Sequence, residues 1–443
     1  MDLAFARAQM GLSLAFHIVF AIIGIGLPVL MVVAEALWLR TGQPVYRDLT
    51  QRWARGTAIL FAVGAVSGTV LSFELGLLWP GFMEHAGGII GLPFSLEGFA
   101  FFTEAIFLGI HLYGWSRVPP LAHWLSAVLV AVSGAASAIF VVTANAWMNA
   151  PTGFEIVDGR VVNIDPVAAM LNPAAPAQVV HMLLAAYVAT GFGVAGVHAW
   201  FLLRDRRDPF HRRAFAIALG LAVLATPLQV ASGDWIARVV AERQPEKFAA
   251  MEGLYRTQAG APLSLGGLAD DERMTLRGAI EIPFGLSLLA HHDPRATVVG
   301  LDAFPRDTWP NVQAVHLAFD VMVLLGLGLL ALSAWAAWSA WRRRGVPDSP
   351  NLLRAAVAAA PAGFIAVEAG WVVTEMGRQP WIIYRVMRTA DAVTPMPGLV
   401  VPFAVFTAVY LLLAAVVIAL LRREFLATDP RRRPAGSPVA DDA

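Results

Sequence analysis

Residues 10–36 read MGLSLAFHIVFAIIGIGLPVLMVVAEA, an almost unbroken apolar run. The hydrocarbon core of a bilayer requires about 20 such residues in a helix, so this run predicts a membrane span. No basic region precedes it and no small-residue cleavage site ends it, which distinguishes it from a signal peptide. We therefore expect a first helix that is retained in the chain.

Eight further runs of the same kind follow along the 443-residue chain, in which 58% of residues are hydrophobic and 14% are charged. This balance is typical of polytopic membrane proteins rather than of soluble domains. The fold class predicted is an all-α polytopic membrane protein with nine transmembrane helices. The predicted spans are 10–36, 54–80, 94–115, 122–147, 176–203, 214–236, 311–341, 353–377 and 398–422.

Basic residues are distributed unequally between the connections. Arginines follow spans one, five, seven and nine, whereas 81–93 has no Lys or Arg and 148–175 has only Arg160. Cytoplasmic loops carry the excess of Lys and Arg in membrane proteins. The N-terminus is therefore predicted to lie outside and the C-terminus in the cytoplasm.

The spans divide the chain into four predicted parts. Residues 1–236 hold helices one to six, and 311–422 hold helices seven to nine. The long connection 237–310 lies outside on this topology, and loops of such length are usually functional or disordered. Residues 423–443, which end RRRPAGSPVADDA, predict a disordered cytoplasmic tail.

Composition also argues against several kinds of function. The chain has no Cys, so it forms neither a disulfide nor a thiolate metal site, and its formal net charge of zero argues against a nucleic-acid-binding surface. No internal repeat appears, so the inverted-repeat architecture of many transporters gains no support.

Ionisable side chains are few within the predicted spans. Each costs free energy there unless it is paired or ligated, so each is a functional candidate. On the predicted topology five helices bring candidates to one outer layer, on the side of the long loop. The candidates, with one Met, are His17, Glu97, Glu104, His111, His181, His198, His316, Asp320, Met322, Glu368 and Glu375.

Histidine, methionine and carboxylate ligands without cysteine suit haem iron, and helical bundles build such sites from facing side chains. A lone His in a span is nevertheless more often a hydrogen-bonded packing residue, and a lone Met is usually core filler. Glu97, Glu104 and His111 are spaced seven residues apart, so they share one helix face that could carry protons. Two acids on one buried face repel each other unless one is protonated or a cation is near.

The motifs around these residues resemble subunit I of the cytochrome bd-type quinol oxidases. The matches occur in family order over nearly the whole chain, and the length of the 237–310 loop is similar to the short-loop branch that includes cyanide-insensitive oxidases. The matching segments are RAQMGLSLAFH (7–17), LEGFAFFTEAIFLG (96–109), ANAWMNAP (144–151), VVHMLLAAYVATG (179–191), KFAAMEGLYRTQ (247–258), FDVMV (319–323) and GWVVTEMGRQPW (370–381).

The resemblance implies three haems: a low-spin haem b, a high-spin haem b, and a haem d or a third haem b. His181 and Met322 would be the axial ligands of the low-spin haem b. His17 and Glu375 would bind the two high-spin haem irons, in an order left open. Trp371 would lie between haems.

The resemblance also assigns polar residues around the haems. Arg378 would hold a haem propionate or Glu375, and Glu97 would lie close to the high-spin pair. Lys247 and Glu252 match loop residues implicated in quinol oxidation, with Glu252 as the base. The proton path from the cytoplasm would include Glu104, Ser137, Asn145 and His111.

Two acids do not fit the pattern simply. Position 320 is Asp in this chain, where many family members carry Arg. A buried Asp cannot neutralise a haem propionate, so that contact must be supplied otherwise or be absent. Glu368 receives no role.

The implied activity is that of a terminal oxidase in the bacterial cytoplasmic (inner) membrane. Ubiquinol or menaquinol would be oxidised at the outer side, and O₂ would be reduced to water with cytoplasmic protons. Proton motive force would arise from charge separation without pumping. Expected partners are the lipid bilayer, a second membrane subunit (subunit II) and, in some members, a small single-span subunit, but no nucleic acid.

Two other classes of function remain open from the residues. A haem b electron-transfer or sensor membrane protein without oxygen reduction would not need Glu375 and the GRQPW end. A secondary transporter would share the intramembrane acids but would leave Met322 and the ligand layer unexplained.

Overall fold

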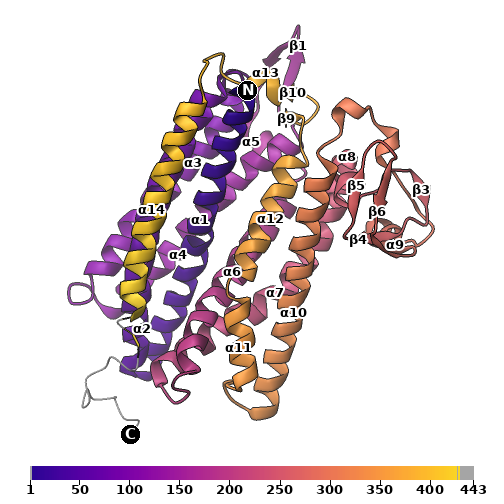
Figure 1. The fold of residues 1–443 in the computed structure, drawn as a ribbon. Coiled ribbons are helices and arrows are strands. Elements are labelled where there is room, and N and C mark those ends of the chain that lie inside the picture. Colours follow the sequence, from indigo (N-terminus) through magenta and orange to yellow (C-terminus); the bar gives the residue numbers. More distant parts are fainter. Residues whose placement is uncertain (1, 427, 430–443) are drawn as a thin grey trace.

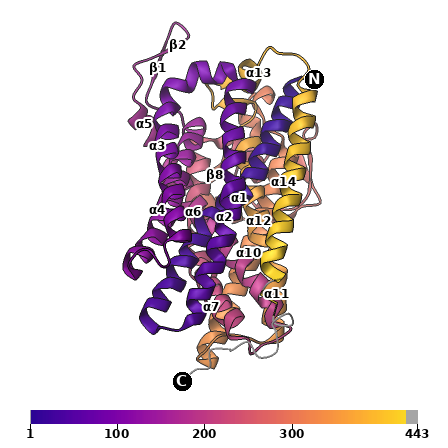
Figure 2. The ribbon, with the colours of Figure 1, turned by 90° about the vertical axis from the view of Figure 1, so that its left-hand side faces the viewer.

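The computed structural model describes residues 2–426 and 428–429, and it is a bundle of long helices (Figures 1 and 2). Within the described residues, nine helical segments are long and apolar enough to cross a membrane, as predicted. They are α1 (Asp2–Thr41), α2 (Pro44–Leu78), α3 (Pro80–Tyr113), α4 (Pro120–Asn149), α6 (Ala175–Leu202), α7 (Pro209–Arg243), α10 (Val312–Arg343), α11 with α12 (Pro350–Ala359 and Ala362–Met376) and α14 (Val400–Leu426).

Helix boundaries differ from the predicted spans for local reasons. The stretch 81–93 belongs to α3 rather than to a connection, and His85 therefore lies in a helix and not in a loop. Pro80 occupies the first turn of α3, where its missing N–H is tolerated. The predicted span 353–377 is divided into α11 and α12 at Pro361, because proline cannot donate the backbone hydrogen bond of a continuous helix.

Close approach of small residues holds the centre of the bundle together. A Cβ added at Gly26 of α1 would lie 2.4 Å from Thr190 Oγ1 of α6, and one at Gly363 of α12 would lie 2.5 Å from the Cα of Ala189. Helices in lipid associate through such small-residue contacts because burial from water does not drive them together. α6 therefore packs closely against α1 and α12 at these two glycines.

Large apolar side chains cover the outer surface of the bundle, as expected for helices that face lipid. Examples on α2, α3 and α14 are Phe73, Leu77, Phe99, Phe102, Leu411 and Leu412, all more than 60% exposed.

The connections contain short antiparallel strand pairs that the sequence did not predict. They are β1 (Glu155–Val157) with β2 (Arg160–Val162), β3 (Gln258–Ala259) with β8 (Thr297–Val298), β4 (Leu263–Leu265) with β7 (Ile280–Ile282), β5 (Leu268–Asp270) with β6 (Thr275–Arg277), and β9 (Trp381–Ile383) with β10 (Met387–Arg388). Strands of two or three residues are too short for an alternation pattern to be read in the sequence. The predicted helical fold class is confirmed, and the strands are confined to the connections.

The long connection is a folded lobe. It contains α8 (Pro245–Met251), α9 (Gly285–His291), three of the strand pairs and two short 3₁₀ helices, Leu301–Ala303 and Arg306–Thr308. α5 (Pro166–Met170) and α13 (Thr389–Ala392) lie in other connections. The lobe is found near the same end of the bundle as the start of α1 and the β9–β10 pair, whereas the turn between α10 and α11 is at the other end (Figure 1). The predicted disordered tail, 423–443, falls mostly outside the described residues.

The contact between Gly363 and Ala189 predicts a specific loss of stability. Gly363→Ala places a methyl group against backbone, and overpacking of this kind costs about 1–3 kcal/mol. We expect a lower melting temperature of the purified protein in detergent, measured by loss of the monodisperse peak after heating. Gly326→Ala is the matched control, since nothing lies within 4 Å of its added Cβ. Equal melting temperatures for the two variants would contradict the packing described here.

Candidate functional site

One face of α4 contacts a succession of buried polar groups on neighbouring helices. The contacting positions are separated by three, four or eight residues, which keeps them on one side of a helix. From the start of α4 to its end they are His123, Ser126, Gly134, Ser137, Asn145 and Asn149. This face of α4 therefore organises the polar interior of the bundle.

The two acids of α3 meet this face at Gly134 and Ser137. Ser137 Oγ donates to Glu97 Oε1 at 3.1 Å, and a Cβ at Gly134 would lie 3.3 Å from both oxygens of Glu104. Glu104 is buried. The structure thus associates Ser137 with Glu97 rather than with Glu104, and the absence of a side chain at Gly134 leaves room for the Glu104 carboxylate.

Glu375 lies at the end of α12 with both carboxylate oxygens engaged. Asn145 Nδ2 donates to Oε1 at 2.6 Å, and Arg378 Nη2 donates to Oε2 at 2.5 Å. α12 ends at Met376, so Arg378 follows in the turn that starts GRQPW and reaches back to the acid. Asn145 is therefore a hydrogen-bond partner of Glu375. Arg378 also binds Glu375, which is one of the two contacts predicted for this arginine.

Arg378 retains donors that could hold an anion. Its side chain is 3% exposed, and within the described residues its Nε and Nη1 atoms have no hydrogen-bond partner. Buried guanidinium donors are rarely left without an acceptor, and the planar group matches carboxylates well. The site can accept a carboxylate such as a haem propionate.

A chain of hydrogen bonds connects Glu375 with the long loop. Asn149 Nδ2 donates to Asn145 Oδ1 at 3.1 Å, and Lys247 Nζ of α8 donates to Asn149 Oδ1 at 2.7 Å. Lys247 also donates to Gln244 Oε1 at 2.9 Å. Burial, and then the nearby Arg378 charge, holds the pKa of Lys247 well below its ordinary value, with Glu375 acting in the opposite direction.

His17 and His181 share one local arrangement. Ser67 Oγ lies 3.0 Å from His17 Nδ1 and donates its own hydrogen to the Val63 carbonyl. With the hydroxyl hydrogen on the Val63 carbonyl, the serine accepts from Nδ1–H, and His17 Nε2 is then the nitrogen that can bind a metal. This arrangement is the usual orientation of a metal-ligating His.

His181 repeats the arrangement on α6. Ser232 Oγ lies 3.0 Å from its Nδ1 and donates to the Gln229 carbonyl. The Gln229 amide nitrogen also lies 3.2 Å from His181 Nε2, so iron ligation there requires this amide to turn away. Trp371 packs on a buried cluster that includes Ile18, Ile22 and Ala186, between the helices that carry the two histidines.

Met322 lies on α10 opposite α12. A Cβ at Gly370, next to Trp371, would come within 3.0 Å of Met322 Sδ. The thioether therefore lies against the helix that carries Glu375.

Asp320 and His316 bind the loop rather than a cofactor. Asp320 Oδ2 accepts from the Gly266 amide at 2.7 Å, and His316 contacts the carbonyl oxygens of Met251 at 2.7 Å and Gly266 at 2.9 Å. His316 is fully buried, although it lies near the start of α10. The loop backbone supplies its partners.

Glu252 is buried beside this anchor. Burial, and then the Asp320 charge, raises the pKa of Glu252 to about 8. Its Oε2 atom has no hydrogen-bond partner within the described part of the chain. Lys247 and Glu252 thus lie on different sides of α8, one toward α4 and the other toward α10.

Sequence reasoning missed several buried polar groups. Glu35 and His123 form a cluster with His111, which is fully buried rather than solvated at a span end. Glu74 accepts from Gln9 at 2.9 Å, and Glu246 binds Tyr384 and Arg385. Glu35 and Glu74 fall inside the predicted spans 10–36 and 54–80, so a complete count of acids in those spans would have found them.

Two further histidines have partners that local sequence cannot indicate. His198 is buried and its Nδ1 lies 2.9 Å from His211 Nδ1. Glu368 has one carboxylate oxygen without a hydrogen-bond partner among the described residues, and no contact assigns it a role.

The helical bundle and its polar interior together indicate the class of protein. Nine candidate spans carry oriented histidines, a methionine and an arginine-bound carboxylate in an apolar interior, which fits polytopic membrane proteins that hold redox cofactors. The family model for "Cytochrome bd terminal oxidase subunit I" matches residues 5–428. The chain belongs to this family.

Individual relatives agree along the whole chain. The putative cytochrome bd menaquinol oxidase subunit I of Bacillus subtilis (strain 168) is 38% identical over 426 residues, which cover 95% of this chain and 96% of the relative. A second B. subtilis relative, cytochrome bd ubiquinol oxidase subunit 1, is 31% identical over 438 residues, covering 96% and 93%. The solved bd oxidase from Geobacillus thermodenitrificans matches with a TM-score of 0.90 and 38% identity over 98% of this chain and 99% of that one.

The family and the nine spans together fix the location and the general cofactor. The chain is a multi-pass protein of the bacterial cytoplasmic membrane, and members of its family carry haem. The residues described above fit such groups: basic nitrogens on His17 and His181, the sulfur of Met322, and the free donors of Arg378.

The Asp320 anchor predicts how firmly the loop is held. Asp320→Ala leaves the Gly266 amide without its acceptor, which costs about 1–3 kcal/mol. Local opening should then raise limited proteolysis within 258–300 about tenfold, because cleavage follows the open population. Glu272→Ala, an exposed change in the same lobe, is the control. Equal cleavage rates for both variants would show that this contact does not restrain the loop.

Proposed function

We propose that this chain is the haem-bearing catalytic subunit of a terminal quinol oxidase. It oxidises quinol at the outer side of the membrane and reduces O₂ to water with cytoplasmic protons, so that charge separation without pumping generates proton motive force. Its parts would be the transmembrane helices within residues 1–236, the extracytoplasmic quinol-binding loop 237–310, the transmembrane helices within residues 311–422 and the cytoplasmic tail 423–443. The relatives named as menaquinol and ubiquinol oxidases support quinol as the substrate class.

The observation that carries the proposal is the hydrogen-bond chain from Lys247 through Asn149 and Asn145 to Glu375. Its consecutive hydrogen bonds join the folded lobe to Glu375 in the candidate ligand layer. A quinol bound at α8 would therefore lie on the side of the bundle where His17, His181, Met322 and Glu375 are expected to hold their cofactors.

The haems of the proposal are a low-spin haem b on His181 and Met322, and a high-spin haem b and a haem d, or third haem b, on His17 and Glu375. When bound, they supply one-electron transfer and the reduction of O₂. Both oxygens of Glu375 already accept hydrogen bonds, so ligation would use a remaining lone pair while Asn145 and Arg378 stay in place.

Residues of this chain would handle the protons on the two sides. Glu252 takes a proton from a quinol hydroxyl, and Lys247 fixes the quinol against α4. Glu104, Glu97 and Ser137 follow one another beside α4 and would carry protons from the cytoplasmic end, with His111 at the entrance. A subunit II partner is expected, as in the family.

A haem b electron-transfer or sensor protein remains the alternative. It would need His181 and Met322 but not the contact of Glu375 with Asn145 and Arg378, which adds a second candidate ligand site at the end of α12. That contact favours the oxidase.

Replacing either low-spin ligand should remove one haem signal selectively. His181→Ala and Met322→Leu are expected to abolish the low-spin b band in the visible spectrum of the dithionite-reduced protein, while the high-spin bands persist. Met182→Leu, at the neighbouring position, is the control and should leave the spectrum unchanged. Persistence of the low-spin band in both ligand variants would refute this assignment, and a purified protein without haem would falsify the proposal.

The raised pKa of Glu252 predicts the pH dependence of quinol oxidation. Below about pH 8 the carboxyl group holds its proton and cannot accept another, whereas above that value it is free to do so. We expect kcat/KM for quinol to rise through about pH 8 in the native enzyme and to lose this rise in Glu252→Gln.

The control for this measurement is Glu242→Gln, because this acid is exposed and does not lie beside Asp320 and His316 as Glu252 does. Lys247→Met should raise KM for quinol at every pH without altering the profile. An unchanged pH profile in Glu252→Gln would place the base elsewhere.

A further inference from the structure

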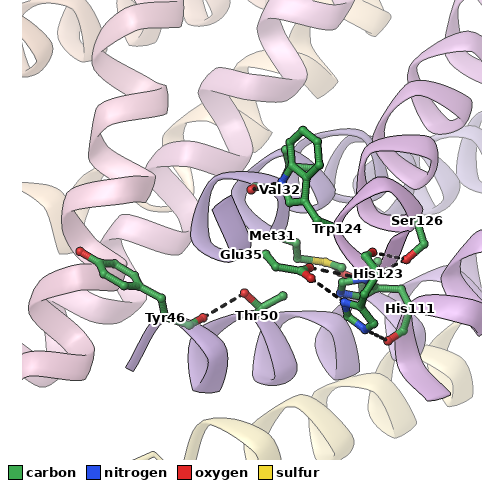
Figure 3. Close-up of polar contacts among 10 residues, drawn as sticks. Met31, Val32, Glu35, Tyr46, Thr50, His111, His123, Trp124 and Ser126 are labelled. Carbon is green, nitrogen blue, oxygen red and sulfur yellow. Dashed lines mark hydrogen bonds and ion pairs between the residues drawn. The ribbon is translucent and has the colours of Figure 1, made fainter. Parts of the chain in front are cut away.

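Three side chains from three spans meet at a buried cluster that includes none of the candidate haem ligands (Figure 3). Glu35 comes from α1, His111 from the end of α3 and His123 from the start of α4. Glu35 and His111 are 0% exposed and His123 is 2% exposed. One ligand atom from each lies within 4.8 Å of the other two.

The contacts of His123 require a proton or a cation between this residue and Glu35. Its Nε2 lies 2.9 Å from the His111 carbonyl oxygen, so it must donate there. Its Nδ1 then faces Glu35 Oε1 at 2.5 Å. Two acceptors cannot share so short a contact without a proton between them, and a cation that replaces this proton must move the two atoms apart to reach its own bond lengths.

Two atoms of the cluster have unused capacity. Glu35 Oε2 and His111 Nε2 are buried, and within the described residues neither has a hydrogen-bond partner. Glu35 Oε2 lies 3.7 Å from His111 Nδ1, a separation too long for a hydrogen bond, so His111 Nε2 is the nitrogen left free to bind an ion. The ring of His111 is oriented by Ser126 Oγ, 3.3 Å from Nδ1.

The donor set selects the kind of ion. Two imidazole nitrogens and one carboxylate oxygen are ligands that Zn²⁺ binds at about 2.0–2.2 Å, with a fourth position left for water. Ca²⁺ and Mg²⁺ prefer oxygen ligands alone. The hydrogen bond from His123 Nε2 to a backbone carbonyl is the contact that commonly orients a zinc-ligating histidine.

We propose that Glu35, His111 and His123 form a binding site for a divalent cation of the zinc class. On binding, the cation takes the place of the proton shared between Glu35 and His123, and that proton leaves to solvent. The site requires no haem and no quinol, so its metal content can be measured separately from the proposed oxidase activity, in which His111 has been placed on the proton path.

The location of the cluster gives the ion a short route. The chain between α3 and α4 is the turn 114–119, next to both histidines. Trp115 from this turn covers them, with its ring centroid 4.0 Å from that of His123 and 5.8 Å from that of His111. Movement of one side chain at the end of the bundle would open the site.

The test is the zinc content of the intact, detergent-solubilised protein with its native subunits. Protein is equilibrated with Zn²⁺, freed of unbound metal and measured by mass spectrometry of the elements. We expect Glu35→Gln and His111→Phe to bind one zinc ion fewer per chain than the native protein. His291→Ala, at an exposed position at the end of α9, is expected to keep that ion in the cluster.

Two measurements keep the result decisive. Retention of the native visible spectrum and elution volume shows that a variant is folded, and His111→Phe preserves the ring shape if Glu35→Gln does not fold. X-ray absorption at the zinc edge should show two imidazole ligands at about 2.0–2.1 Å in the native protein. Equal zinc contents in native protein and folded variants, or a shell with fewer than two imidazoles, would overturn the proposal.

Discussion

The constraint on which this structure depends is the cost of a charged group inside an apolar bundle. An acid within the spans is costly without a partner, because neither lipid nor apolar side chains can solvate it, and Glu368 is one acid for which no such contact is seen among the described residues. α4 supplies many of these partners along one face, from His123 beside Glu35 to Asn145 beside Glu375. The positions of the acids on α1, α3 and α12 are thus coordinated through a single helix.

The same constraint explains why the long loop is folded. Lys247 is buried and reaches α4 through Asn149, while Asp320 and His316 hold the loop backbone from α10. A buried ammonium group, a buried carboxylate and a buried imidazole each have defined partners, so the lobe is attached at two separate helices. A substrate site on α8 would inherit that rigidity, since both sides of this short helix are fixed.

Histidine has two distinct uses in this chain. In His17 and His181 a serine accepts from Nδ1 and leaves Nε2 basic, which suits a metal ligand. In His316 both ring nitrogens contact backbone carbonyls, which suits a structural anchor. The residue type is the same, and the neighbours decide the chemistry.

The sequence by itself determined the nine spans, the family resemblance and most of the candidate ligands. Hydrophobic length and short motifs are local properties, and they can be read without knowing which helices touch. Only the tertiary structure decided the partners: Ser137 with Glu97, Asn145 with Glu375, and Glu35 with His111 and His123. These pairs join residues from 40 to 230 positions apart, and their geometry depends on helix rotation and close packing, which no local pattern encodes.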